Sequence, residues 1–274
     1  MKKLFIFAMA FVASVLAFTS CDPNNPDNPQ EVSSIKELVG TKWRVDSAYV
    51  GDNVPTHMYE VFEITSENSF KLLGESDTYS LEVKDHKVTL ADYPIDAQTL
   101  NVVKATKEWI HLSAIVPIDE NWDGTPDKEG PFNLYISRIP ESNGEKVPLT
   151  AENIVGTWKG DYYEESGVYT SGESWYRVLP SLSFHGLDYI TFKADGTLEY
   201  VNLMDQALGV SEPMGGRWAI VDGKFAYSTG DADGQGFEVW QYGTPDELTT
   251  NVFILRRVWP EYIQVFIDHF HKVK

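Results

Sequence analysis

The chain has 274 residues, of which 42% are hydrophobic and 13% aromatic, and its net charge is -19. This length suits one large or two ordinary globular domains, and the composition excludes an intrinsically disordered chain. The 41 acidic residues outnumber 22 Lys and Arg, which argues against nucleic acid as a partner because phosphate binding needs clustered cations.

Residues 1–20 predict a secretory signal peptide, with Lys2 and Lys3, an apolar run over 4–18 and small residues before Cys21. The run is short for a membrane-spanning helix. Cys21 is the only cysteine, and its position resembles the lipobox of bacterial lipoproteins. We therefore expect Cys21 to carry a lipid anchor; a secreted protein with one free thiol is the alternative.

The segment after Cys21 is a predicted tether over 21–32. Residues 22–31 contain three prolines and no apolar side chain, so they cannot pack into a core. An Asn- and Pro-rich spacer after such a cysteine resembles those of Bacteroidota outer-membrane lipoproteins, and this resemblance implies an envelope protein held at the bacterial outer membrane. Whether it faces the cell surface or the periplasm stays open.

The rest of the chain contains an internal repeat. Ile35–Trp43 and Leu149–Gly160 share a short helical turn followed by Gly-Thr and a tryptophan, and each is followed by runs of β-branched and aromatic residues between turn residues. Each copy predicts eight strands, at 43–50, 59–65, 69–73, 78–84, 87–91, 98–104, 108–116 and 132–139, and at 157–163, 187–193, 197–203, 215–221, 224–229, 236–242, 250–258 and 262–270.

Tight and long connections alternate in the first copy, as they do in an up-and-down antiparallel barrel with one open end. The sequence therefore predicts an all-β protein: two tandem eight-stranded antiparallel barrels over 33–140 and 150–274, joined by a linker at 141–149.

Two short motifs support a resemblance to a known family. Ile154-Val-Gly156-Thr-Trp158 resembles the opening of the domains of the lipocalin-like lipoproteins of Bacteroidota, and Phe192-Lys-Ala-Asp195-Gly196-Thr197 resembles the hairpin that follows it in that family. The resemblance implies a barrel and no particular activity. It also implies that Trp43 and Trp158 close the barrel floor beside a basic residue of the last strands, for which Arg138 and Arg257 are the candidates.

The connection after the first strand is longer in the second copy than in the first. It adds Tyr169, Trp175 and Tyr176 beside Tyr162 and Tyr163. In a lipocalin-like barrel this loop lies over the mouth, so these rings are candidates for binding an apolar molecule or a glycan. Rings that merely cap the core are the alternative.

The segment 119–129 has the oxygen-donor spacing of a calcium-binding loop. The candidate ligands are Asp119, Asn121, Asp123, Thr125 and Asp127. The closing glutamate expected at the twelfth position is missing, so a solvated acidic turn is the alternative. We expect no other cofactor.

No set of residues indicates catalysis. The cysteine is assigned to the lipid anchor, the histidines have no metal-site spacing beyond His269 and His271, and no Gly-rich phosphate loop is present. We therefore expect a non-enzymatic protein that binds a small apolar molecule or glycan, with the second barrel as the favoured site. The alternative is a structural subunit of an envelope complex with filled barrels and a protein partner.

Overall fold

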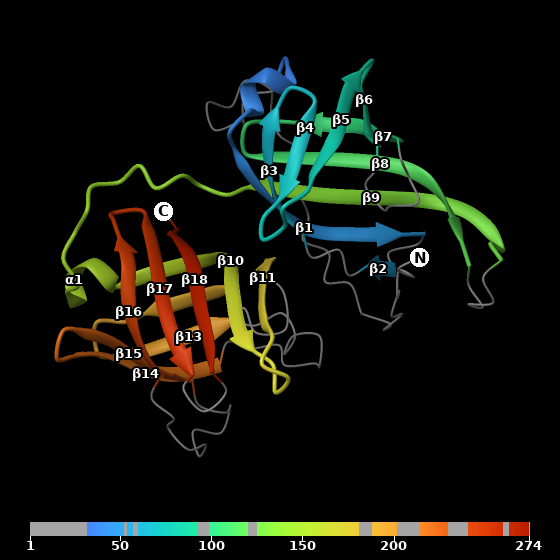
Figure 1. The fold of residues 1–274 in the computed structure, drawn as a ribbon. Coiled ribbons are helices and arrows are strands. Elements are labelled where there is room, and N and C mark those ends of the chain that lie inside the picture. Colours follow the sequence, from blue (N-terminus) through green and yellow to red (C-terminus); the bar gives the residue numbers. More distant parts are fainter. Residues whose placement is uncertain are drawn as a thin grey trace. The chain divides into compact units, whose positions relative to one another are not determined.

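The computed structural model describes residues 32–51, 54–56, 60–91, 99–119, 125–180, 188–201, 214–229, 241–259 and 263–273. The fold is all-β, and the chain divides into two compact units, Met1–Ile139 and Pro140–Lys274 (Figure 1). Each unit is a closed antiparallel barrel of eight strands with one short helix, as the sequence predicts.

The first barrel follows the 3-10 helix η1 (Ile35–Leu38). Its ring is closed by pairing of the first and last strands, β1 and β9, while β2 extends the sheet beside the end of β1. The strands are β1 (Lys42–Val50), β2 (Val54–Thr56), β3 (Val61–Ser66), β4 (Ser69–Leu72), β5 (Thr78–Lys84), β6 (Lys87–Ala91), β7 (Thr99–Ala105), β8 (Trp109–Ile118) and β9 (Lys128–Arg138).

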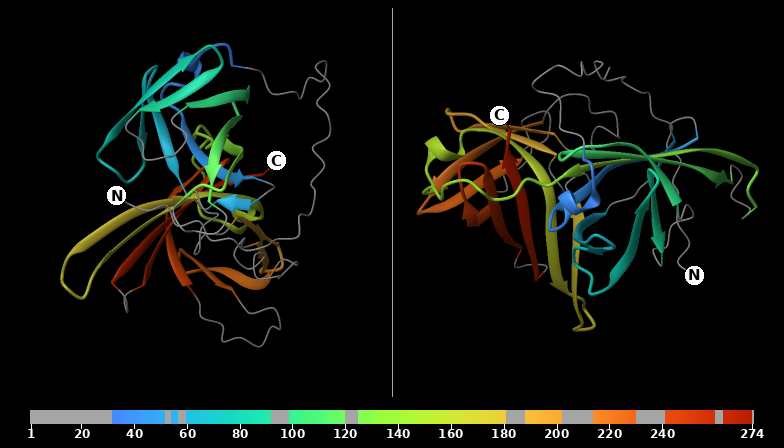
Figure 2. Two further views of the ribbon diagram at one scale, coloured as in Figure 1. Left: turned by 90° about the vertical axis from the view of Figure 1, so that its right-hand side faces the viewer. Right: turned by 90° about the horizontal axis from the view of Figure 1, so that it is seen from above.

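The second barrel follows helix α1 (Ala151–Ile154) and repeats this topology. The pairing of β10 with β18 closes its ring, and β11 extends it as β2 does in the first barrel (Figure 2). The strands are β10 (Gly156–Val168), β11 (Ser174–Pro180), β12 (Tyr189–Phe192), β13 (Thr197–Val201), β14 (Met214–Val221), β15 (Lys224–Thr229), β16 (Gln241–Leu248), β17 (Val252–Trp259) and β18 (Gln264–Lys272).

The two barrels match residue by residue in strand register. Trp43 faces Arg138 across β1 and β9, and Trp158 faces Lys272 across β10 and β18. Three residues later each first strand has a β-bulge, which holds Asp46 in one barrel and Asp161 in the other. Below, residues at the same register position of the two barrels are called equivalent.

Each bulge aspartate binds a side chain of the last strand. Asp46 accepts a hydrogen bond of 3.0 Å from the Ser137 hydroxyl, and Asp161 lies 2.9 Å from Nδ1 of His271, the residue equivalent to Ser137. A bulge bends its strand and increases the local twist. We infer that the two bulges help to close both rings.

Two predicted segments differ in the structure. The connection expected to be a loop over the second barrel is a β-hairpin, because β10 runs on to Val168 and pairs with β11. The segment 141–149, expected to be a linker, packs on the second barrel: Val147 contacts its core, and Asn251 donates hydrogen bonds to Glu141 and Asn143.

Candidate binding cavity

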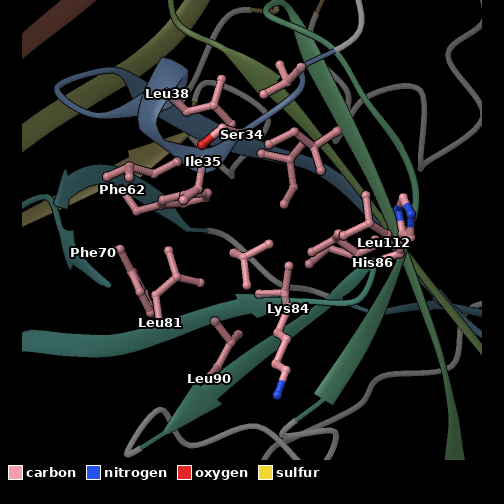
Figure 3. A pocket seen from close by; sticks show the side chains of 18 of the residues that line it. Ser34, Ile35, Leu38, Phe62, Phe70, Leu81, Lys84, His86, Leu90 and Leu112 are labelled. Carbon is pink, nitrogen blue, oxygen red and sulfur yellow. The ribbon is translucent and has the colours of Figure 1, made fainter. Parts of the chain in front are cut away.

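The interior of the first barrel contains a cavity of about 360 Å³ that is partly open to solvent. Its walls come from alternate residues of eight strands, because side chains of a strand alternate between the two faces of the sheet. Figure 3 shows several of the side chains around it. The apolar lining residues are Val32, Ile35, Leu38, Val45, Phe62, Ile64, Phe70, Leu72, Leu81, Val83, Val88, Leu90, Val102, Ile110, Leu112, Leu134 and Ile136.

The polar lining residues come from the segment before η1, from the start of β3 and from the β5–β6 turn. They are Ser33, Ser34, Glu60, Lys84, Asp85 and His86. Lys84, Asp85 and His86 are exposed, so the turn forms a rim between the cavity and solvent. The amine of Lys84 extends away from the apolar side chains (Figure 3).

The equivalent positions of the second barrel carry larger rings. Seven aliphatic lining residues of the first barrel, from six strands, are each replaced by an aromatic residue. The pairs are Ile64 and Phe192, Leu72 and Tyr200, Leu81 and Trp218, Val88 and Phe225, Leu90 and Tyr227, Ile110 and Phe253, and Ile136 and Phe270. Two positions change in the opposite direction: Phe62 and Phe70 correspond to Ile190 and Leu198.

These rings pack on one another. The Phe225 ring centre lies 5.2 Å from that of Phe192 and 5.4 Å from that of Phe253, both in edge-to-face geometry. On β16, Gly243 has no room for a side chain, since a Cβ there would lie 2.4 Å from Leu255. This half of the second barrel is therefore filled by its own side chains.

Farther along β17 and β18, the second barrel buries an ion pair. Arg257 donates hydrogen bonds of 2.5 and 2.7 Å to the Asp268 carboxylate, and both side chains are 7% exposed. Burial alone would lower the pKa of Arg257, but the Asp268 carboxylate outweighs it and the pKa is raised. The equivalent residues of the first barrel are Ala114 and Leu134.

The five predicted aromatic residues do not form one loop site. Tyr162 and Tyr163 are buried on β10, where Tyr162 stacks on His269 at 4.0 Å between ring centres. Tyr169 and Tyr176 are exposed on the β10–β11 hairpin, and Tyr176 donates a 2.6 Å hydrogen bond to Glu164. Burial and then Glu164 raise the pKa values of Tyr162 and Tyr176.

Trp175 is half-buried on β11. Its ring packs against Gly167, its cross-strand partner, and the Arg177 guanidinium lies 5.3 Å from the ring centre. Arg177 in turn donates a 2.7 Å hydrogen bond from Nε to the buried Glu165. The hairpin is thus held by its own cross-strand contacts.

The tryptophans expected at the barrel floors are fully buried. Nε1 of Trp43 donates to Thr41, and Nε1 of Trp158 donates to the Ile154 carbonyl, both at 2.7 Å. Arg138 is the cross-strand partner of Trp43.

The expectation for Arg257 is wrong. Arg257 faces Phe266 on β18, which is six residues, or about 20 Å, from Lys272 along that strand. The cation over Trp158 is Lys272, with its amine 5.2 Å from the ring centre.

The predicted calcium loop lies at the tip of the β8–β9 hairpin. Asn121 and Asp123 fall outside the described residues, while the Asp127 amide donates to the Ile118 carbonyl at 2.8 Å. In the described part of the chain, no three His, Cys, Asp or Glu side chains could share a metal ion. Calcium binding stays a prediction.

The leader, Cys21 and the tether also lie outside the described residues, so lipidation stays a prediction. Over the residues that the structure describes, no helix combines the length and apolar character needed to cross a membrane.

Comparisons with known proteins give likenesses to solved structures alone: no family model and no curated protein matches the chain. A double mutant of the vaccine antigen transferrin binding protein B from Haemophilus parasuis Hp5 is 12% identical, with a TM-score of 0.23 over 84% of this chain. The chain spans only 45% of that protein's length.

A second similar structure is a protein of unknown function from the DUF3598 family of Nostoc punctiforme PCC 73102. It is 8% identical, with a TM-score of 0.21 over 88% of this chain and 100% of that chain. At such low TM-scores we transfer no function from either structure.

Proposed function

We propose that this chain is a lipid-anchored envelope protein whose first barrel binds a small, mainly apolar molecule. The observation that supports the proposal is the mainly apolar cavity of about 360 Å³ inside that barrel. Ligand sites are commonly cavities of roughly 300–1,000 Å³ with apolar walls and a few polar groups. The proposed activity is binding without catalysis.

The equivalence of the two barrels strengthens this proposal. Val88 and Leu90 stand where Phe225 and Tyr227 fill the second barrel, so the fold itself does not require an open interior. The apolar walls of such a cavity favour an apolar molecule over water, since they offer water no hydrogen-bond partners. The open first barrel is therefore the better candidate for a binding site.

A titration with the neutral apolar dye N-phenyl-1-naphthylamine tests the proposal. We expect a saturable rise in fluorescence with one site per chain. Val88→Phe introduces the ring of the equivalent Phe225 into the cavity and should weaken binding at least tenfold. Ile115→Phe is the matched control, because Ile115 is 66% exposed on the outside of β8.

Equal dye binding by the wild type and Val88→Phe would place the dye elsewhere and reject the cavity as the site. Absence of saturable binding to the wild type would reject the first barrel as a site for apolar molecules and leave the lipid anchor to its own test. Circular dichroism melts of both variants verify that neither result comes from unfolding.

For the second barrel we propose a structural role. Its aromatic core fills part of the interior, and the buried Arg257–Asp268 pair occupies space farther along β17 and β18. Lipidation is tested by mass spectrometry of the processed N-terminus: we expect acyl chains on Cys21 and their loss in Cys21→Ser. A processed chain with an unmodified thiol would reject the anchor and leave the binding proposal intact.

A further inference from the structure

The β5–β6 turn at the rim of the cavity has an unusual residue in it. Both central residues adopt left-handed backbone conformations, Asp85 with φ 51° and His86 with φ 59°. The equivalent turn of the second barrel uses Asp222 and Gly223, with φ 50° and 74°. Glycine adopts this conformation without steric cost, whereas a residue with a side chain is strained in it. The first barrel thus places an imidazole where its counterpart has glycine.

Strained residues often mark functional sites, but the strain alone identifies no ligand. A second observation is that His86 and its neighbours Lys84 and Asp85 line the cavity. The equivalent of Lys84 in the second barrel is the uncharged Val221.

The β5–β6 turn is also locally basic. Lys84 faces Lys87 across the turn, and Asp85 is the single acidic residue among the four. Apart from Asp85, the carboxylate in the cavity lining is that of Glu60, which precedes β3. Glu37 of η1 lies outside the lining: it accepts hydrogen bonds from the amide and hydroxyl of Ser33, and Lys107 lies 3.5 Å from its carboxylate. In a chain with a net charge of -19, this cationic turn is a local exception.

We propose that the ligand of the first barrel is a single-chain amphiphile with an anionic end, and that His86 and Lys84 bind that end. This inference depends on the proposed function of the cavity. The alkyl chain would lie among the aliphatic walls, while the anion would stay at the turn, where the Lys84 amine and the His86 ring reach solvent. A charged end left at the rim avoids the cost of burying it.

The cavity volume sets the length of the alkyl chain. An engineered apolar cavity of about 150 Å³ holds one benzene molecule, so a cavity more than twice as large suits a chain of about twelve carbons. A fatty acid and an alkyl phosphate both fit this description.

Isothermal titration calorimetry with four dodecyl compounds tests the inference: laurate, dodecyl phosphate, dodecanol and dodecylamine. We expect both anions to bind about tenfold more tightly than dodecanol, and dodecylamine to bind most weakly. Whichever anion binds more tightly identifies the head group as carboxylate or phosphate.

Variants of the turn connect this preference to residues. His86→Gly and Lys84→Gln should each weaken anion binding about five- to tenfold and leave dodecanol binding unchanged, since each removes one hydrogen-bonding or charged group from the rim. His86→Gly should also keep or raise the melting temperature, because glycine suits the left-handed turn. Lys224→Gln, at the position equivalent to Lys87 in the second barrel, is the matched control.

The outcomes separate the two proposals. If dodecanol binds as tightly as laurate, or if the rim variants bind anions like the wild type, the anionic ligand is rejected while the apolar site stands. If none of the four compounds binds, the cavity is not a binding site and both proposals fail.

Discussion

The two barrels of this chain have one topology and two kinds of interior. The first and last strands close both rings in the same register, with a bulge aspartate at the same place. Mostly aliphatic residues line a cavity in the first barrel, and aromatic residues stand at seven of the equivalent positions in the second. Backbone pairing therefore fixes the shape of the ring, while side-chain volume at a few inward positions decides whether the ring is open.

The comparison extends to charge. Ala114 and Leu134 of the first barrel correspond to Arg257 and Asp268 of the second. A buried ion pair is a weak source of net stability, because desolvation of two charges offsets their attraction. The apolar pair shows that the fold does not need the ions. The Arg257 and Asp268 side chains instead occupy space inside the second barrel and make that part of its interior polar.

The largest effect is expected when one partner of that ion pair is removed. Asp268→Ala leaves the Arg257 guanidinium buried without its carboxylate and should cost about 3–5 kcal/mol of unfolding free energy. Introducing both residues of the first barrel, Arg257→Ala with Asp268→Leu, should cost less than the single change, because no buried charge remains. Guanidinium denaturation followed by tryptophan fluorescence measures both variants. A double variant as unstable as Asp268→Ala would show that the pair contributes more than mutual neutralisation.

A smaller effect is expected when the two interiors exchange one side chain. Phe225→Val opens space in the second core and should cost about 2–4 kcal/mol, since it removes buried volume from a packed site. Val88→Phe adds a ring where the first barrel has a cavity, so its cost should stay below about 1 kcal/mol. Denaturation of both variants measures the costs, and equal costs would contradict the difference between the cores.

The fold could be predicted from the sequence because its signals are local. Turn dipeptides such as Asp195-Gly196 and the alternation of apolar residues define hairpins within a few positions. The sequence does not predict the β10–β11 hairpin. The second half of β10 is a polar stretch, and it extends as a strand because it pairs with β18, about 100 residues away along the chain. Long-range pairing of this kind leaves no short-range pattern.

The cavity could not be predicted from either copy alone. The cavity results from the summed size of side chains on eight strands. Aromatic residues such as Tyr169 and Tyr176, by contrast, can be noticed in a single segment of the sequence. The sequence nevertheless contains a signal of the difference between the barrels. When residues 81–88 are aligned with 218–225, Val88 falls on Phe225 and His86 falls on Gly223. The prediction of Arg257 at the floor is wrong for a related reason. The family resemblance does not specify the register between β10 and β18, and in the structure that register pairs Lys272 with Trp158.

The smallest effect concerns pH, and it also distinguishes the two interiors. Burial raises the pKa of Tyr227 in the second core to about 12, from an ordinary value near 10. Below pH 10 the phenol is protonated in both the folded and unfolded chain, so its contribution to stability is complete. Between pH 10 and 12 the unfolded chain loses the proton first, and the free energy of unfolding should fall by up to about 1.4 kcal/mol per pH unit.

Tyr227→Phe removes this titration and should therefore flatten the alkaline loss of stability. Tyr79→Phe in the first barrel is the control: a hydrogen bond to Glu75 raises the pKa of Tyr79 to about 12, but its ring lies near the surface, where solvent screens such effects. Denaturation at pH 9, 10 and 11 compares the three proteins. If Tyr227→Phe loses stability as steeply as the wild type, the filled core does not hold its tyrosine in the neutral form, and the alkaline sensitivity of the second barrel has another source.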